Sequence, residues 1–140
     1  MKSVLLFLLF YLLSFPADAT LKGAEATRQI MVFRQELNRC LDITSEENQE
    51  KKYGQKVEEC YRKVGHQIIK TFYSKEKNVS ADFNKLIEAT NKAYAHMFLL
   101  DYCHPNCGSQ AIEASYSYIN FAIREYLDSL LGVVQAQEKN

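Results

Sequence analysis

Residues 101–109 read Asp101-Tyr102-Cys103-His104-Pro105-Asn106-Cys107-Gly108-Ser109 and separate two long segments of apolar periodicity. Pro105 has no backbone N–H to donate, and it disfavours helical geometry at His104. Asn106 and Gly108 tolerate left-handed backbone conformations, and Ser109 can cap a helix that follows it. The pattern therefore predicts a tight turn between two helices, with a cysteine on each side of the proline.

The segments on either side of this turn have the spacing of helix faces. Residues of the earlier segment that fall on one face are Phe83, Leu86, Thr90, Ala93, Met97 and Leu100, widened by Ile87, Tyr94 and Phe98. In the later segment, about 111–134, they are Ile112, Tyr116, Ile119, Ile123, Tyr126, Leu130 and Val133, widened by Phe121, Leu127, Leu131 and Val134. We expect the polar residues 135–140 to fray.

Two further helices are predicted before residue 75. The inner face of the first, 21–43, consists of Ala26, Ile30, Phe33, Leu37 and Cys40. The inner face of the second, which ends near Ser74, consists of Tyr53, Val57, Cys60, Val64 and Ile68, flanked by Tyr61 and Phe72. Its start is open, because Thr44 and Glu47 fit a capping box while Gly54 allows a later start. Gly65 permits close helix contact, marks a bend, or is a tolerated mid-helix glycine.

Four long helices with short links favour an all-α fold, a four-helix, mostly up-and-down antiparallel bundle. In that topology all four cysteines lie toward one end of the bundle. The apolar stripes are wider than a two-stranded coiled-coil seam, which suits burial inside a bundle.

Residues 1–19 have the pattern of a secretory signal peptide. Lys2 is followed by an apolar run, and Ala17-Asp18-Ala19 forms a small-x-small cleavage site after Pro16. The run is shorter than the roughly 20 residues of a membrane span. We therefore expect cleavage after Ala19 and one secreted, extracellular domain over 20–140, with no membrane attachment after cleavage.

The charge balance argues against some classes of partner. The chain has 17 Lys and Arg residues against 17 Asp and Glu residues. The leader removes one charge of each sign, so the mature chain stays neutral. Because no basic excess is present, nucleic acid is a poor candidate as a partner.

An even number of cysteines in an oxidising compartment indicates two disulfides, formed by Cys40, Cys60, Cys103 and Cys107. Four cysteines allow three connectivities. The local pairing, Cys40–Cys60 with Cys103–Cys107, is favoured because short loops close most easily. The alternative pairing Cys40–Cys107 with Cys60–Cys103 would tie the two hairpins together. The Cys-His-x-x-Cys spacing also resembles a metal motif, but His66 and His96 show no ligand spacing, so neither a metal nor a cofactor is predicted.

Asn78-Val79-Ser80 is an N-glycosylation sequon. We expect it in an exposed polar turn over 75–79, with Ser80 as the N-cap of the third helix. A signal peptide makes the sequon usable in a secretory pathway, so Asn78 is a predicted glycosylation site.

No catalytic residues are predicted, because the sequence lacks a nucleophile elbow, a phosphate loop and a His-Glu-x-x-His motif. The adjacent acids Glu46-Glu47 and Glu58-Glu59 are expected on outer helix faces, since neighbouring helix residues diverge. The sequence therefore predicts a protein that is not an enzyme.

The chain contains nine tyrosines and no tryptophan. Tyr94, Tyr102, Tyr116 and Tyr118 surround the turn and form a possible binding face, since tyrosine is enriched at interfaces. Core packing is the alternative role of each. Two functions compete: an extracellular interaction or effector protein that binds another protein, and a carrier that holds a small apolar ligand within the bundle. A well-packed core with an exposed apolar patch favours the first, and a cavity with convergent hydroxyls favours the second.

Overall fold

The computed structural model describes residues 21–43, 50–99 and 109–139, with side chains at 21–43, 53–93 and 115–139. Its elements are α2 (Ala24–Arg39), the short 3-10 turn η1 (Cys40–Asp42), α3 (Glu50–Phe72), α4 (Lys77–Leu99) and α5 (Ser109–Gln137). No strand occurs in these ranges. The predicted all-α class and the four predicted helices are confirmed. The predicted leader, 1–19, lies outside the described residues.

The helix boundaries differ from the expected ones at two places, and the structure also decides against one of the two predicted starts of α3. Described α3 includes Glu50, so the helix does not start after Gly54, while the predicted start at Thr44 lies outside the described residues. Helix α4 begins at Lys77, so Ser80 lies inside the helix and the prediction that it is the N-cap was wrong. The early start has a cause in packing, because Val79 is buried and donates its N–H to the Glu76 carbonyl at 3.2 Å. Helix α5 continues through Gln137, so residues 135–137 are helical and not frayed.

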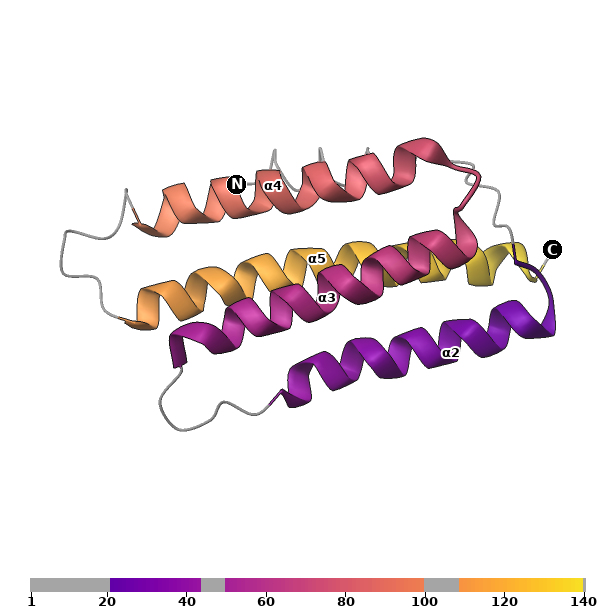
Figure 1. Cartoon of the computed structure of the whole chain (residues 1–140), viewed down its shortest axis with the longest axis horizontal. Helices are drawn as coiled ribbons and strands as arrows, with labels where there is room; N and C mark the ends of the chain where they lie inside the picture. Colours follow the sequence, from indigo (N-terminus) through magenta and orange to yellow (C-terminus); the bar gives the residue numbers. More distant parts are fainter. Residues whose placement is uncertain (1–20, 44–49, 100–108, 140) are drawn as a thin grey trace.

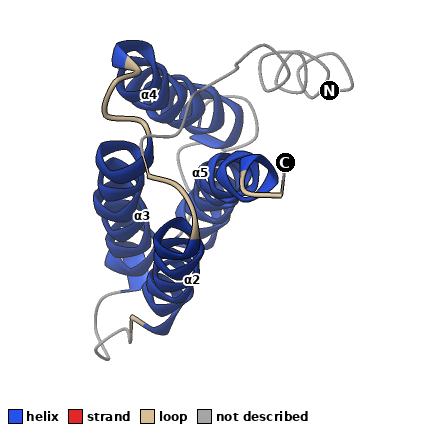
Figure 2. Cartoon of the chain, turned by 90° about the vertical axis from the view of Figure 1, so that its right-hand side faces the viewer, coloured by secondary structure: helices blue, strands red, loops and turns tan. Residues whose placement is uncertain are grey.

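Successive helices run antiparallel, so the chain goes up and down the bundle as predicted (Figure 1). Helices α3 and α5 form the central pair, which has the most extensive contact between elements. Helices α2 and α4 lie on opposite sides of that pair (Figure 2). The end of α2 and the start of α3 therefore lie at the same end of the bundle as the end of α4 and the start of α5.

The described core follows the predicted faces closely along α2 and α3. All five inner residues predicted for α2 are buried. The core of α5 is displaced toward the residues predicted only to widen its stripe, because Leu127, Leu131 and Val134 are fully buried while Tyr126, Leu130 and Val133 are half-buried. Two expectations were wrong: Ala93 and Phe121 are exposed. The side chains of Tyr94, Met97, Phe98, Leu100 and Ile112 lie outside the described residues.

Gly65 lies where three helices meet. A Cβ atom on it would be 2.5 Å from Phe83 Cζ of α4 and 2.9 Å from Leu127 Cδ2 of α5. The Phe83 ring also stacks on Tyr126, with 5.8 Å between the ring centroids. Of the roles considered for Gly65, close helix contact is the one that the structure supports.

Helix α2 is joined to the rest of the bundle by an aromatic contact and polar bonds. The rings of Phe33 and Phe72 meet edge to face at 5.9 Å. Arg34 Nη2 donates to Gln135 Oε1 at 2.9 Å, and the Gly23 N–H donates to Glu138 Oε2. The first residues of α2 therefore lie beside the last residues of α5.

Glu58 does not lie on an outer face, contrary to the expectation from its neighbour. It is 6% exposed, and its Oε1 accepts a hydrogen bond from Asn91 Nδ2 of α4 at 3.1 Å. Arg62 Nη1 lies 4.0 Å from the same oxygen. Because a buried carboxylate needs such partners, the group links α3 to α4 and is a structural feature of the interior.

None of the described helices is both long and apolar enough to cross a membrane.

Candidate functional site

A groove of about 480 Å³ opens between the end of α2, the first half of α3 and the middle of α5. Helix α3 contributes aromatic, aliphatic and glycine positions, and α5 contributes Phe121 together with polar and charged residues. The lining residues are Asn38, Leu41, Tyr53, Gly54, Val57, Tyr61, Ser117, Asn120, Phe121, Arg124, Glu125 and Asp128. On α5 these positions recur at spacings of three and one, which is one face of a helix.

The floor of the groove depends on close contact between α3 and α5 at Gly54. A Cβ atom there would lie 2.4 Å from Tyr116 Cβ, which is fixed to the backbone and cannot move aside. The Gly54 carbonyl accepts a hydrogen bond from Asn120 Nδ2 at 3.0 Å. Asn120 is only 8% exposed, and its Oδ1 has no donor in the described part of the chain. Leaving a buried amide oxygen without a donor is unfavourable.

Arg124 is the cation of the groove, and its position is held from several sides. Its Nε donates to Asp128 Oδ2 at 2.7 Å, and its Nη2 donates to Asn38 Oδ1 of α2 at 2.9 Å. The guanidinium lies 6.0 Å from the centroid of the Tyr61 ring, within range of a cation–π contact. Burial by itself lowers the pKa of Arg124, but the bonds to Asp128 and Tyr61 outweigh it and raise the pKa. Arg124 is therefore a permanent, oriented charge.

The Tyr61 hydroxyl is a neutral group at this site. Burial raises its pKa above the ordinary value, and the neighbouring Arg124 opposes this rise. The ring is 2% exposed and belongs to the core. Tyr61 therefore presents an uncharged edge to the groove at physiological pH.

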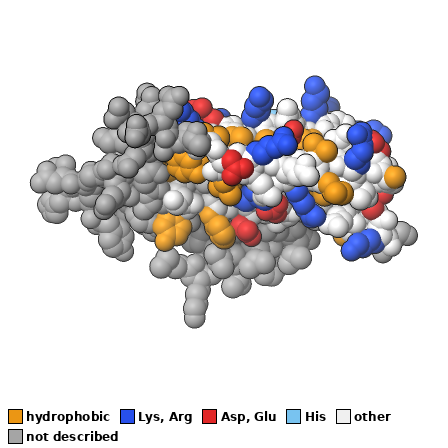
Figure 3. All heavy atoms as spheres, turned by 90° about the horizontal axis from the view of Figure 1, so that it is seen from below, with side chains coloured by type: hydrophobic (Ala, Val, Ile, Leu, Met, Phe, Trp, Pro, Cys, Tyr) orange, Lys and Arg blue, Asp and Glu red, His pale blue; other side chains and the backbone are white. Residues whose placement is uncertain are grey.

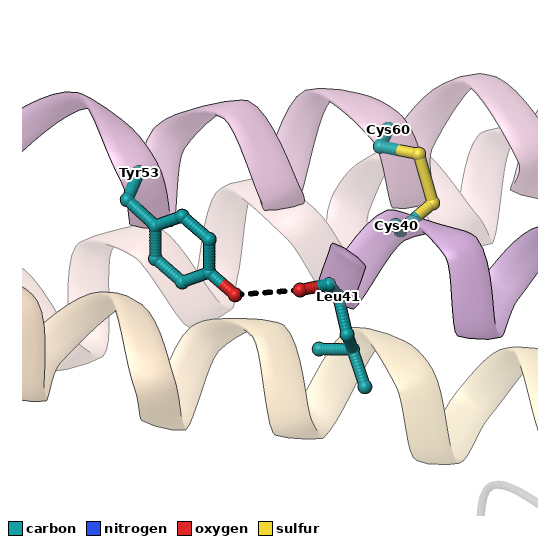
Figure 4. The surroundings of a disulfide bond; sticks show 4 residues. All are labelled: Cys40, Leu41, Tyr53 and Cys60. Carbon is teal, nitrogen blue, oxygen red and sulfur yellow. Dashed lines mark hydrogen bonds between the residues drawn. A yellow bond between two sulfur atoms is a disulfide. The ribbon is translucent and has the colours of Figure 1, made fainter. Parts of the chain in front are cut away.

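The wall beside α2 is built around a disulfide, shown in Figure 4. Cys40 and Cys60 are bonded, with their Cα atoms 5.6 Å apart. The next residue, Leu41, accepts a hydrogen bond on its carbonyl from the Tyr53 hydroxyl at 2.9 Å. The disulfide and this hydrogen bond together hold η1 against α3. They therefore fix the positions of Leu41 and Tyr53, which both line the groove. The Cys40–Cys60 half of the favoured pairing is confirmed, while Cys103 and Cys107 lie outside the described residues.

Large apolar side chains form part of the groove rim. Phe121 is 63% exposed and Leu41 is 53% exposed. Phe121 was predicted to widen the buried stripe of α5. Its side chain instead points away from the buried face that carries Ile119, Ile123 and Leu127, because residues two apart on a helix diverge. Figure 3 shows hydrophobic side chains exposed among charged ones on the face seen from below.

The predicted tyrosine face falls only in part on described residues. Tyr116 is half-buried, packs against the core and contacts Gly54, while Tyr118 is 51% exposed. Neither lines the groove, although Tyr116 lies directly behind its floor. The side chain of Tyr94 and all of Tyr102 lie outside the described residues.

Asn78 is exposed, but it lies in the first turn of α4 instead of the polar turn that was expected. The antiparallel topology puts this turn at the end of the bundle opposite the Cys40–Cys60 disulfide (Figure 1). A modification at Asn78 would therefore leave the groove open.

Several groove residues had no signal that sequence reasoning used. Arg124 and Asp128 have the i, i+4 spacing of a helical ion pair, which could have marked them as a surface pair. Nothing in the local sequence indicates that Asn38 accepts a hydrogen bond from Arg124, or that Asn120 donates one to the Gly54 carbonyl. Among the described residues no cluster of three His, Cys, Asp or Glu side chains could hold a metal ion.

The groove combines exposed apolar side chains with an oriented guanidinium and two carboxylates. Comparison of the chain with protein-family models, with curated proteins and with solved structures finds no match.

Proposed function

We propose that this protein is a secreted interaction protein, which acts by binding an extracellular partner protein rather than by catalysis. The observation that carries the proposal is the groove, where exposed Phe121 and Leu41 border fixed polar groups. Apolar anchors beside oriented hydrogen-bonding groups are typical of protein interfaces. Secretion is supported by the leader pattern of residues 1–19, and the Cys40–Cys60 disulfide is compatible with an oxidising compartment.

The test places a photo-crosslinking benzoylphenylalanine at position 121 of the full chain, expressed through a secretory pathway. The matched control places it at position 31, because Met31 is 60% exposed on α2 and does not line the groove. After irradiation in fluid from the secreting source, we expect a discrete protein adduct from position 121 and none of that mass from position 31. The same adducts from both positions, or none from position 121, would refute the proposal.

A second candidate function is an extracellular carrier of a small apolar molecule. The observation that favours it is the groove volume of about 480 Å³, which lies within the roughly 300–1,000 Å³ of small-molecule pockets. Titration of the purified protein with an apolar naphthylamine dye distinguishes the two candidate functions. Saturable uptake at one dye per chain, lost in Phe121→Ala and kept in Met31→Ala, would favour the carrier.

A further inference from the structure

The chain has no net charge, but the charged side chains exposed on the second half of α3 are all basic. Arg62, Lys63 and Lys70 are exposed there, at spacings that keep them on one side of the helix. No Asp or Glu occurs between residues 60 and 75 of the sequence. Along the helix axis, Arg62 and Lys70 are about 12 Å apart. Figure 2 shows that no described helix lies against the side of α3 turned away from α5.

Two more lysines continue the positive charge past the end of α3. Lys75 lies in the turn between α3 and α4, Lys77 is the first residue of α4, and both are exposed. Lys77 and Asn91 are about four helical turns apart, and Asn91 donates a hydrogen bond to Glu58 of α3. Lys77 therefore lies on the side of α4 that is nearer to α3. We call the five cations the basic strip: Arg62, Lys63, Lys70, Lys75 and Lys77.

The charges of the basic strip are largely unpaired. Arg62 Nη1 lies 4.0 Å from Glu58 Oε1, and the Arg62 side chain is 49% exposed. The four lysines of the strip form no ion pair with any residue that the structure describes. Helix α4 also has no acidic residue in its first turn, where the helix dipole favours an anion and disfavours a lysine. Neither ion pairing nor the helix dipole therefore accounts for Lys77.

The basic strip has no exposed apolar side chains beside it, and this limits the class of its partner. The aromatic residues of the same segment, Tyr61, Phe72 and Tyr73, are buried. Among the described residues, large exposed hydrophobic side chains occur on α2, η1 and α5, and not on α3 or α4. Helices that bind membrane surfaces insert apolar side chains, and proteins that bind single-stranded nucleic acid stack bases on aromatic rings. The strip therefore fits a partner that is held by charge.

From these observations we infer that the basic strip binds an extracellular linear sulfated polysaccharide, whose sulfate groups pair with the ammonium and guanidinium groups. Clusters of lysine and arginine are typical of heparin-binding patches. No residue of the strip lines the groove, so the inference assigns a second surface to the protein. It shares with the proposed function only the premise that the protein is secreted.

The test measures binding of the full secreted protein to a heparin octasaccharide by isothermal titration calorimetry at physiological salt. N-glycans are removed enzymatically beforehand, because a glycan at Asn78 would lie beside Lys77. The same octasaccharide without its sulfate groups is the control ligand. We expect the sulfated form to bind and the desulfated form not to bind. The affinity should fall as the salt concentration rises, because pairing of these charges releases counterions.

Two double variants make the test specific to the strip. Lys63→Gln with Lys70→Gln should weaken binding roughly ten-fold, because each exposed ion pair contributes up to about five-fold. Lys85→Gln with Lys92→Gln removes two exposed lysines of α4 outside the strip. This matched control should change the affinity by no more than about two-fold, because salt screens distant exposed charges. Both double variants should keep the melting temperature of wild type.

Three results would overturn the inference. The first is that the sulfated octasaccharide fails to bind, or binds no more tightly than the desulfated one. The second is an equal loss of affinity in the two double variants. The third is tighter binding to vesicles of phosphatidylcholine and phosphatidylserine, or to a DNA duplex, which would assign the strip to another class of partner. The proposed function would survive each result, because crosslinking from position 121 tests the groove separately.

Discussion

Two glycines determine how closely the helices of this bundle approach one another. Gly65 leaves room for the Phe83 ring and the Leu127 side chain, and Gly54 leaves room for Tyr116. At Gly65 the neighbours are side-chain atoms, while at Gly54 the neighbour is a Cβ atom. Because a Cβ moves only with its backbone, an added methyl group at Gly54 would have to separate α3 from α5.

The first prediction concerns Gly65→Ala. Overpacking against Phe83 costs about 1–3 kcal/mol, and the better helix propensity of alanine returns up to about 1 kcal/mol. We expect a net loss of stability in urea unfolding. The control is Gly132→Ala, where the added Cβ meets nothing within 4 Å, so stability should rise by up to about 1 kcal/mol. A Gly65→Ala variant as stable as Gly132→Ala would contradict the close packing of α3, α4 and α5.

The second prediction concerns alkaline pH. Burial raises the pKa of Tyr126 to about 12, with Asp82 adding to the rise. Because the folded pKa exceeds the unfolded value near 10, the stabilisation is complete below pH 10 and is lost as the pH rises from 10 to 12. In Tyr126→Phe, which keeps the ring against Phe83, the loss of melting temperature across this range should be smaller than in wild type. Identical pH profiles of the two proteins would contradict the assignment.

At the scale of elements, the third prediction concerns which face of α5 packs against the core. Ile123 is fully buried and Phe121 is 63% exposed, although they are two residues apart. Ile123→Asp should lower stability by about 3 kcal/mol or more, because it buries an unpaired charge. Phe121→Asp should leave the melting temperature within a few degrees of wild type. The melting temperature of each variant is measured by circular dichroism. An equal loss of stability in both variants would show that the buried face of α5 was assigned wrongly.

The fourth prediction concerns the Cys40–Cys60 disulfide, which links η1 to α3. Replacing Cys40 and Cys60 together by alanine should lower stability by about 2–4 kcal/mol, since the bridge restricts the unfolded chain. It should also weaken groove ligands, because Leu41 and Tyr53 lose the support of the covalent bond beside them. An unchanged yield of the adduct crosslinked from position 121 would show that the Tyr53–Leu41 hydrogen bond holds the wall by itself.

At the scale of the whole molecule, we expect the secreted protein to begin at Thr20 and to contain no free thiol. The leader pattern of 1–19 and the even number of cysteines are the reasons. Amino-terminal sequencing and thiol titration of secreted material check both points. A protein that retains Met1 would remove the basis for the proposed extracellular function, while two free thiols would leave Cys103 and Cys107 unpaired.

The groove and the predicted glycosylation site lie at opposite ends of the bundle. The groove and the Cys40–Cys60 disulfide lie toward the end where α2 passes to α3, and Asn78 lies at the opposite end (Figure 1). Helix α2 (16 residues) is shorter than α5 (29 residues), and its start is aligned with the last described residues of the chain. The groove lies beside the end of α2, where Asn38 and Leu41 line it.

The sequence by itself determined the helical class, the number of helices and the inner faces of α2 and α3, and it favoured the Cys40–Cys60 bridge without excluding the other pairings. These features depend on local periodicity and short loop closure, which neighbouring residues specify. Only the tertiary structure decided that Phe121 is exposed, that Glu58 is buried against Asn91, and that Asn38, Arg124 and Asp128 form one network. Those outcomes depend on the rotation and length of each helix relative to its neighbours. Because that rotation is set by contacts such as Gly54–Tyr116 and Gly65–Phe83, no single helix contains the information that defines the groove.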